Sequence, residues 1–311
     1  MTIASQRTPD ERFADLPGYD FAPHYIDTLP AYEGLRIHYL DESPDDGSAR
    51  DGDAVPTFLC LHGEPTWCYL YRKMIPVFTA AGGRVVAPDL LGFGRSDKPV
   101  DDRVYTFGFH RDMLLAFIRH LDLRNITLVC QDWGGLLGLT LPMEMATRFS
   151  RLIVMNTALA VGQHPGEGFA AWKAFNASQP DLDVAGLMQR AVDGMSDAEA
   201  RAYAAPFPDA SFKGGVRRFP ELVMVSPEME GVDVSQRAMR WWMNEWQGQS
   251  FMAIGMQDPV LGPPVMQALR KVIRGCPEPL EVREAGHFVQ EHGEIVAREA
   301  LRAFSSAVSP R

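Results

Sequence analysis

The sequence predicts an α/β fold with a mostly parallel central sheet flanked by helices and with an inserted helical cap. Continuous apolar runs such as residues 126–130, typical of strands buried on both faces, alternate with helical periodicity such as that of residues 107–121. This β-α-β-α order favours parallel strands with helices on both faces. From about residue 157 to 227 the alternation stops, and prolines interrupt helical segments that enclose no clear buried strand.

The chain is therefore expected to divide into a discontinuous α/β core, residues 1–156 and 228–311, and a helical cap domain, residues 157–227. We expect residues 1–30 to be an irregular arm, residues 35–40 a half-exposed edge strand, and residues 43–53 an acidic hairpin loop. Core strands are expected at residues 56–62, 84–89, 126–130, 151–156, 250–256 and 280–283, and helices at residues 107–121, 263–274 and 295–304.

The composition limits the classes of function. The formal net charge of -10 argues against nucleic acid or an anionic membrane surface as the main partner, because both repel an acidic protein. No stretch approaches the ~20 apolar residues of a membrane helix, and the polar N-terminus lacks an apolar signal segment, so we expect a cytoplasmic protein. The four cysteines lie far apart without a C-x-x-C pair, which favours free thiols over disulfides or a metal site.

The end of the strand at residues 126–130 carries a candidate nucleophile. Asp132 falls on the turn into a helix, and the small residues Cys130, Gly134 and Gly135 surround it. This is the small-x-nucleophile-x-small-small order of an elbow in which strand and helix approach closely. A carboxylate attacks as an anion without first losing a proton, which suits displacement at a saturated carbon. The alternative is that Asp132 only caps the helix.

A second motif, His62-Gly-Glu-Pro-Thr-Trp67, follows the strand at residues 56–62. In elbow-type hydrolases such a loop supplies one backbone N–H of the oxyanion hole, and the residue after the nucleophile supplies the other. Those donors would be the amides of Glu64 and Trp133. A metal site at His62 and Glu64 is the alternative, but no further ligand stands at a suitable spacing.

Asp258 and His287 follow two later strands, at the edge where open α/β sheets place their sites. Their order after Asp132, nucleophile then acid then histidine, is the hydrolase order. A histidine can deprotonate water near neutral pH, and a carboxylate against its other nitrogen fixes the tautomer. Taken alone, His287 could be a loop histidine and Asp258 a turn residue; together with the elbow they predict a catalytic triad.

These motifs resemble the haloalkane dehalogenases of the α/β-hydrolase superfamily, specifically subfamily I, which is typified by the 1,2-dichloroethane-hydrolysing enzyme. The resemblance covers nearly the whole chain and rests on His62-Gly-Glu-Pro-Thr-Trp67, Gln131-Asp-Trp-Gly-Gly135, Gly168-Phe-Ala-Ala-Trp-Lys173, Ala202-Tyr-Ala-Ala-Pro-Phe-Pro208, Phe251-Met-Ala-Ile-Gly-Met-Gln-Asp258 and Gly286-His-Phe-Val-Gln-Glu291. It implies Asp132 as nucleophile, His287 as general base and Asp258 as the residue that orients the histidine.

The resemblance also implies two indole donors to the departing halide, Trp133 beside the nucleophile and Trp172 from the cap. An indole suits a halide in a dry pocket, because it offers one N–H and no competing acceptor. An ionised Glu64 could not donate to halide, which makes a cap donor necessary, whereas Trp241, Trp242 and Trp246 are interpreted as packing residues. The implied substrate pocket consists of Phe169, Phe219, Pro220, Val223, Val260 and Leu261. Leu136 and Val161 stand where the close relative has aromatics.

The predicted reaction is hydrolysis of a small halogenated alkane through an aspartyl-alkyl ester, giving alcohol, halide and a proton without cofactor or metal. Such an enzyme would serve detoxification, with haloalkane, halide and water as its partners, and we expect a monomer. An epoxide hydrolase is the nearest alternative, but it generally needs two cap tyrosines and the cap has one, Tyr203. A non-catalytic interaction module of the same fold, from another class, would be expected to have a broken triad.

Overall fold

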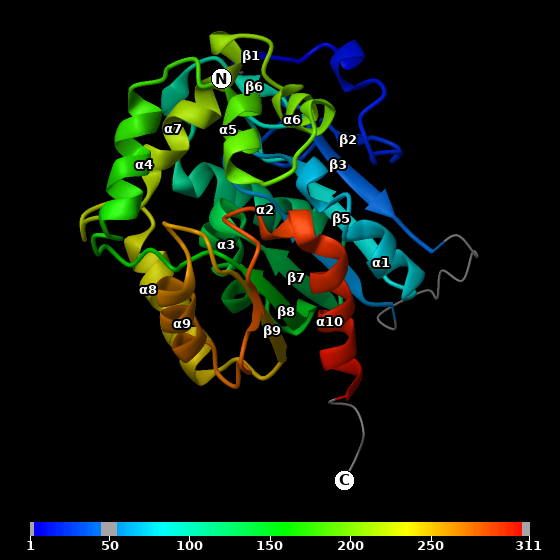
Figure 1. Cartoon of the computed structure of the whole chain (residues 1–311), viewed down its shortest axis with the longest axis vertical. Coiled ribbons are helices and arrows are strands. Elements are labelled where there is room, and N and C mark those ends of the chain that lie inside the picture. The colour runs from blue at the N-terminus through cyan, green and yellow to red at the C-terminus, as the bar shows by residue number, and fades with distance from the viewer. Residues whose placement is uncertain (1–2, 45–54, 307–311) are drawn as a thin grey trace.

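The computed structural model describes residues 3–44 and 55–306 (Figure 1). The strands are β1 (Ser5–Gln6), β2 (His24–Ile26), β3 (Ile37–Glu42), β4 (Thr57–Leu61), β5 (Arg84–Pro88), β6 (Lys98–Pro99), β7 (Ile126–Cys130), β8 (Phe149–Met155), β9 (Gln249–Gly255) and β10 (Leu280–Val282). The α-helices are α1 (Ile75–Ala80), α2 (Phe107–His120), α3 (Asp132–Gly138), α4 (Glu167–Ala177), α5 (Val184–Ala191), α6 (Asp197–Ala204), α7 (Gly214–Leu222), α8 (Val232–Asn244), α9 (Pro263–Val272) and α10 (Gly293–Ser306). The 3-10 helices are η1 (Asp10–Phe13), η2 (Cys68–Tyr71), η3 (Asp102–Val104), η4 (Pro142–Glu144), η5 (Ala146–Arg148), η6 (Ala210–Lys213) and η7 (Val289–His292).

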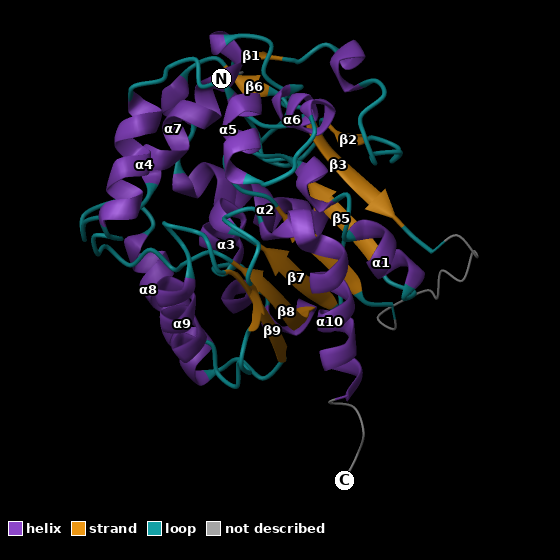
Figure 2. Cartoon of the chain, in the orientation of Figure 1, coloured by secondary structure: helices purple, strands orange, loops and turns teal. Residues whose placement is uncertain are grey.

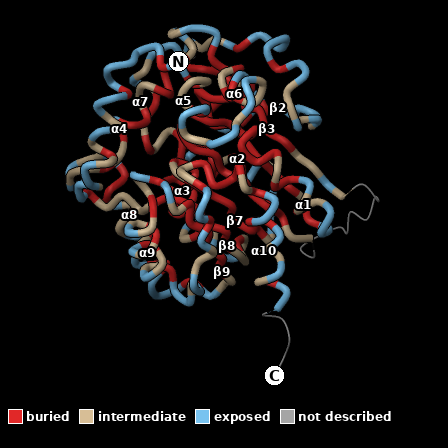
Figure 3. Tube along the Cα trace, viewed as in Figure 1, coloured by how far each residue is buried: buried red, intermediate tan, exposed pale blue. Residues whose placement is uncertain are grey.

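An eight-stranded sheet forms the centre, in the order β10-β9-β8-β7-β4-β5-β3-β2. The strands from β10 to β5 pair in parallel, whereas β3 pairs antiparallel with both β5 and β2. Every residue of β4 and β7 is buried, as continuous apolar strands covered on both faces should be. Figure 3 shows this burial running through the sheet, with exposed residues at the periphery. The mostly parallel α/β sheet predicted from the sequence is confirmed.

Residues 157–227 contain helices and no strand, and the chain returns to the sheet only at β9. Helix α4 packs against α7, and α5 packs against α6. These helices gather over one end of the sheet, whereas α8, α9 and α10 lie beside its strands (Figures 1 and 2). This arrangement accords with the cap that the sequence suggested, although the two domain boundaries themselves stay a prediction.

The first forty residues differ from the prediction. The segment expected to be a half-exposed edge strand is β3, and four of its six residues are buried. The arm before it is not wholly irregular, because β2 adds a strand outside β3 and β1 pairs with β6. The alternation of apolar and polar residues in β3 therefore did not indicate an exposed edge, because β2 pairs with β3 on that side. Of the predicted acidic loop at residues 43–53, all but the first two residues lie outside the described part of the chain.

Pro220 also departs from expectation, because it lies inside α7 rather than breaking the helix there. Proline cannot donate to the carbonyl four residues earlier, which here belongs to Val216. That carbonyl accepts instead from the buried side chain of Asn176 on α4, at 3.2 Å. A cross-helix amide thus replaces the missing helical hydrogen bond, so α7 continues through the proline and is tied to α4.

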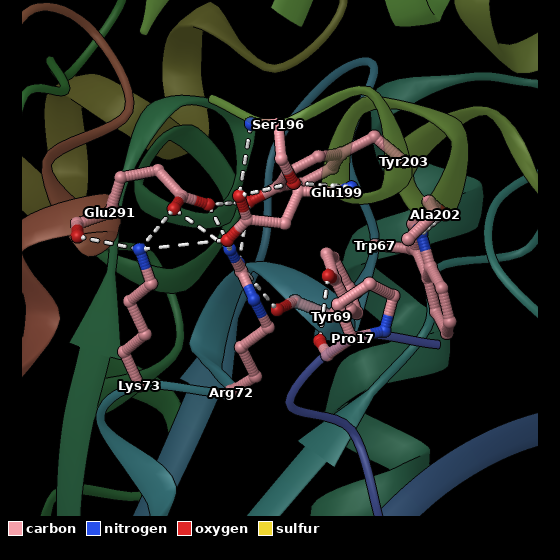
Figure 4. Close-up of polar contacts among 10 residues, drawn as sticks. All are labelled: Pro17, Trp67, Tyr69, Arg72, Lys73, Ser196, Glu199, Ala202, Tyr203 and Glu291. Carbon is pink, nitrogen blue, oxygen red and sulfur yellow. Dashed lines mark hydrogen bonds and ion pairs between the residues drawn. The ribbon is translucent and has the colours of Figure 1, made fainter. Parts of the chain in front are cut away.

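A buried ion network, which we call the Arg72 network, joins α6 to the core (Figure 4). Arg72 donates to both carboxylate oxygens of Glu291 on η7, at 2.7 and 2.9 Å, and to Glu199 on α6 at 2.9 Å. Lys73 donates to Glu291 at 2.8 Å, and the Tyr203 hydroxyl donates to the same carboxylate. Burial alone would raise the pKa of Glu291, but Arg72 outweighs it and lowers that pKa. The network is therefore ionic and fastens α6 to the segment after His287.

Candidate active site

The backbone at Asp132 has the strained form expected of an elbow. Its φ is 50°, in the left-handed region that side chains rarely adopt. A Cβ on Gly134 would lie 1.9 Å from the Leu61 carbonyl oxygen, and one on Gly135 would lie 2.1 Å from Thr157 Oγ1. Only glycine fits at these two positions, because strand β4 and the end of β8 press against α3. The close packing turns the Asp132 side chain towards the cavity described below.

The carboxylate of Asp132 has two different environments. Its Oδ1 accepts from the backbone N–H of Glu64 at 2.8 Å, whereas its Oδ2 lies 3.5 Å from Nε2 of His287. The N-cap residue of α3 is Gln131, and no side-chain hydrogen bond caps that helix. Asp132 therefore does not act as the N-cap of α3.

Asp258 and His287 are brought together as the sequence suggested. Nδ1 of His287 lies 2.8 Å from Asp258 Oδ2. Burial would raise the pKa of Asp258, but His287, Asn156 and a backbone N–H outweigh it, so the pKa is lowered. Burial likewise lowers the pKa of His287, but the carboxylates of Asp258 and Asp132 outweigh it and raise that pKa to about 10. The histidine is thus held between two negative charges.

Asn156 is a site residue that the sequence reasoning missed. Its side-chain N–H donates to Asp258 Oδ2 at 2.9 Å, and the same amide exchanges hydrogen bonds with the backbone of Gly255. The backbone amides of Val260 and Leu261 also donate to Asp258, at 2.8 and 3.1 Å. Its position in the sequence could have indicated this role, because Asn156 directly follows β8 at the carboxyl edge of the sheet. These donors fix the carboxylate that orients His287.

Glu64 differs from the sequence-based view of it as a charged residue. Its side chain is buried, and among the described residues Oε1 has no hydrogen-bond partner. Burial, reinforced by the charge of Asp132, raises the pKa of Glu64 well above its ordinary value. This favours the neutral acid, which does not repel halide as the ionised group would.

A cavity of about 790 Å³ opens at these residues, and Glu64, Asp132, Trp133, Asp258 and His287 all line it. Its apolar lining includes Leu136, Val161, Phe169, Trp172, Pro220, Val223, Val260 and Leu261. Polar side chains that the sequence did not single out, Gln163, His164, Arg190, Asp193, Gln257 and His292, line it too. The site is thus a chamber with a largely apolar surface that also presents charged and amide side chains, as a small-molecule site requires.

Phe219 is an exception among the expected pocket residues. It is fully buried and does not line the cavity. Its ring centroid lies 4.7 Å from that of Trp133 and 4.7 Å from that of Phe93. Phe219 therefore stands behind the indole of Trp133, where it packs against that ring instead of meeting a ligand.

The other tryptophans considered as halide donors have different partners. Trp242 Nε1 donates to the Leu139 carbonyl at 2.7 Å, and Trp246 Nε1 donates to Ser250 Oγ at 2.9 Å. Neither these residues nor Trp241 line the cavity. Their arrangement fits the packing role that the sequence suggested.

Possible metal ligands lie away from this chamber. His62 Nε2 accepts from the Leu90 amide at 2.9 Å, so its lone pair is already used within the fold. In the described part of the chain, one group brings three potential ligand atoms within 4.8 Å of one another, namely His38, Cys68 and Asp89. His38 and the Cys68 amide are already hydrogen-bonded to Asp89, at 2.7 and 2.8 Å. These contacts account for the group as part of the core, and none of the three residues lines the cavity.

Comparison with known proteins places this site in a family. Residues 56–294 match the family model described as alpha/beta hydrolase fold. A haloalkane dehalogenase of Psychrobacter cryohalolentis is 46% identical, over 94% of this chain and 95% of its own length, and one of Mycolicibacterium paratuberculosis is 39% identical, over 97% and 98%. The solved structure of the haloalkane dehalogenase DpaA from Paraglaciecola agarilytica, described as tetrameric, matches with a TM-score of 0.93 at 54% identity, over 97% of this chain and 99% of that one. The chain therefore belongs to the haloalkane dehalogenases, α/β-hydrolase enzymes that act on carbon–halogen bonds.

Proposed function

We propose that Asp132, His287 and Asp258 carry out the dehalogenase reaction in two steps. In the first, an oxygen of Asp132 attacks the halogen-bearing carbon as the carbon–halogen bond breaks, and the halide leaves with the bonding electrons. In the second, His287 takes a proton from water, and the resulting hydroxide attacks the carbonyl carbon of the ester. The tetrahedral intermediate releases the alcohol and restores the Asp132 carboxylate, while the proton leaves from His287.

The main support for this proposal is that the two oxygens of the Asp132 carboxylate have different neighbours, the Glu64 amide and His287. Because the Glu64 amide already donates to Oδ1, that oxygen would bear the negative charge in the tetrahedral intermediate. The amide of Trp133, at the start of α3, is the proposed second donor. Alkylation also removes one of the charges that raise the pKa of His287, so formation of the ester makes the histidine a better acceptor of the water proton.

The test is halide release from a panel of chloro-, bromo- and iodoalkanes of increasing length. The wild type should release halide, and Asp132→Asn, which keeps the shape of the side chain, should reduce release to background. The aliphatic Leu136 and Val161 and the 790 Å³ cavity support turnover of chains longer than two carbons. Undiminished halide release by Asp132→Asn would remove Asp132 from the mechanism.

An epoxide hydrolase activity receives less support. Tyr203, the single tyrosine expected in the cap, donates to Glu291 in the Arg72 network and does not line the cavity. No tyrosine lines the cavity in the described part of the chain, so the hydroxyl donors that would activate an epoxide oxygen are missing there. The intact hydrogen bond between His287 and Asp258 likewise argues against a non-catalytic module.

For halide, we propose Trp133 and Trp172 as the two indole donors, since both line the cavity that Asp132 also lines. Trp172→Phe keeps an aromatic ring but removes the N–H. Loss of a hydrogen bond to a charged group costs about 1.5–3 kcal/mol, so bromide affinity should fall about 10- to 150-fold. Isothermal titration with bromide measures this, with Trp241→Phe as the control outside the cavity. Equal bromide affinity in Trp172→Phe and wild type would exclude Trp172 as a donor.

We propose a cytoplasmic enzyme that binds haloalkane, halide and water and works as a monomer with the core and cap boundaries given above. No described helix has both the length and the apolar character needed to cross a bilayer. The Paraglaciecola relative is described as tetrameric, so sedimentation of the purified chain is the direct measurement of its own state.

A further inference from the structure

The residue before the nucleophile, Gln131, has a side chain that the reaction scheme above does not use. It is fully buried, between the end of β7 and the start of α3. Its Nε2 lies 2.8 Å from His287 Nε2 and 3.1 Å from the backbone carbonyl oxygen of His287. One amide group therefore contacts the proposed base at two atoms.

The backbone contact determines which way the Gln131 amide points. A carbonyl oxygen can only accept a hydrogen bond, so the group facing His287 O must be the NH₂. The same NH₂ faces His287 Nε2, which must then present its lone pair. On the other side of the ring, Nδ1–H donates to Asp258 at 2.8 Å. The two contacts together favour the neutral tautomer with its proton on Nδ1, in opposition to the two carboxylates that raise the pKa of the ring.

Further buried side chains lie behind this amide. Nε2 of Gln290 lies 3.5 Å from Gln131 Oε1 and 3.5 Å from the Tyr71 hydroxyl. That hydroxyl donates to the Leu61 carbonyl at 2.7 Å, on the strand beside β7. Gln131, Gln290 and Tyr71 are all fully buried. The amide is therefore held against the central sheet and is not free to turn in solvent.

We propose that Gln131 is a positioning residue that favours the neutral, Nδ1-protonated form of resting His287 by donating to Nε2, until the hydrolytic water takes that place and gives its proton to the same lone pair. This inference rests on the proposed function of His287. Asp258 and Asp132 lie against the ring, and Glu64 interacts with it electrostatically. The two carboxylates nearest to it favour the imidazolium, whereas the Gln131 NH₂ disfavours it, because an Nε2–H would point at another donor.

The effect of the Gln131 NH₂ on the imidazolium matters most after each turnover. Once His287 has taken the proton from water, its Nε2–H faces the NH₂ of Gln131, and loss of that proton restores the hydrogen bond. Gln131 thus favours proton release as well as the base-competent state. It takes part in no bond making or breaking, and alkylation of Asp132 does not depend on it.

Two variants test this, each followed by single-turnover kinetics. Gln131→Met keeps the size but removes the donor, so the apparent pKa of the hydrolytic step should move up, by about one pH unit for a tenfold change in proton affinity. Gln131→Glu supplies a carboxylate that holds the imidazolium, so the upward shift should be larger and the alkyl ester should accumulate at neutral pH. The alkylation rate of Gln131→Met should stay within about threefold of wild type, a difference below 1 kcal/mol.

Gln249→Met is the matched control, because Gln249 is a partly buried glutamine hydrogen-bonded to Arg151 and lies outside the cavity. Thermal melting of each variant separates misfolding from catalysis, and if Gln131→Met does not fold, Gln131→Glu decides alone. An unshifted pH profile, or equal losses in alkylation and hydrolysis, would overturn the positioning role. If the wild type itself forms no ester with an alkyl halide that it turns over, the proposed function fails, and not this inference alone.

Discussion

Replacement of His287 by glutamine is expected to trap the alkyl ester on Asp132. The attack on the halogen-bearing carbon needs only the carboxylate, whereas hydrolysis needs a base to deprotonate water. One equivalent of halide should appear in a burst, and subsequent turnover should fall by roughly 10²–10⁴-fold, the usual contribution of general base catalysis. Intact mass spectrometry should find a mass gain equal to one alkyl group, and peptide mapping should place it on Asp132.

The control is His120→Gln, a histidine exposed at the end of α2, which should turn over normally without a mass gain. The same experiment on His287→Gln with Asp132→Asn added should give neither burst nor adduct. A single mutant that releases no halide, or that carries the alkyl group elsewhere, would contradict the two-step scheme with these residues in these roles.

Removal of the Arg72 side chain is expected to produce a large loss of stability. Arg72→Ala leaves the Glu291 carboxylate, whose side chain is 4% exposed, with Lys73 as its remaining cation. Breaking a buried ion pair by removing one partner typically costs about 3–5 kcal/mol of the free energy of unfolding. Urea unfolding followed by circular dichroism at pH 7 measures the loss. Arg298→Ala, which removes an exposed pair on α10 with Glu294, should change stability by less than about 0.5 kcal/mol.

The same network gives a pH dependence with a definite sign. The pKa of Glu291 is lowered in the folded protein, so the network adds stability above the ordinary glutamate pKa of about 4.3 and loses it as the pH falls below that value. The stability difference between wild type and Arg72→Ala should therefore narrow below about pH 4. A difference that stays constant from pH 7 to pH 3 would show that Arg72 acts only through packing.

The features that could be predicted from the sequence are those that depend on local patterns of residues. Asp132, Asp258 and His287 could be proposed because each follows a recognisable strand, and parallel strands bring their carboxyl ends to one edge. The structure places their side chains within hydrogen-bonding or ion-pairing distance of one another. The parallel order of the central strands followed from the same reasoning.

Contacts between distant segments could not be predicted in this way. Arg72 and Glu291 are separated by 219 positions, and nothing near either residue indicates the other. Gln131 looked like a neutral spacer in the elbow, because its role depends on a histidine 156 positions later. Burial, which local sequence does not determine, sets the roles of two further residues. Phe219 packs behind the ring of Trp133 and does not line the cavity. The buried side chain of Glu64 favours its neutral form.

The proline in α7 has a consequence for how this sequence can change. Asn176, which replaces the hydrogen bond lost at Pro220, lies one helical turn after Trp172 and on the same face of α4. The rotation of α4, and with it the direction of the indole at 172, is therefore set partly by a residue on another helix. Because residues that share a hydrogen bond are expected to couple, we expect substitutions at positions 176 and 220 to combine non-additively. A change at either position is therefore expected to alter which residues the other can accept without loss of stability.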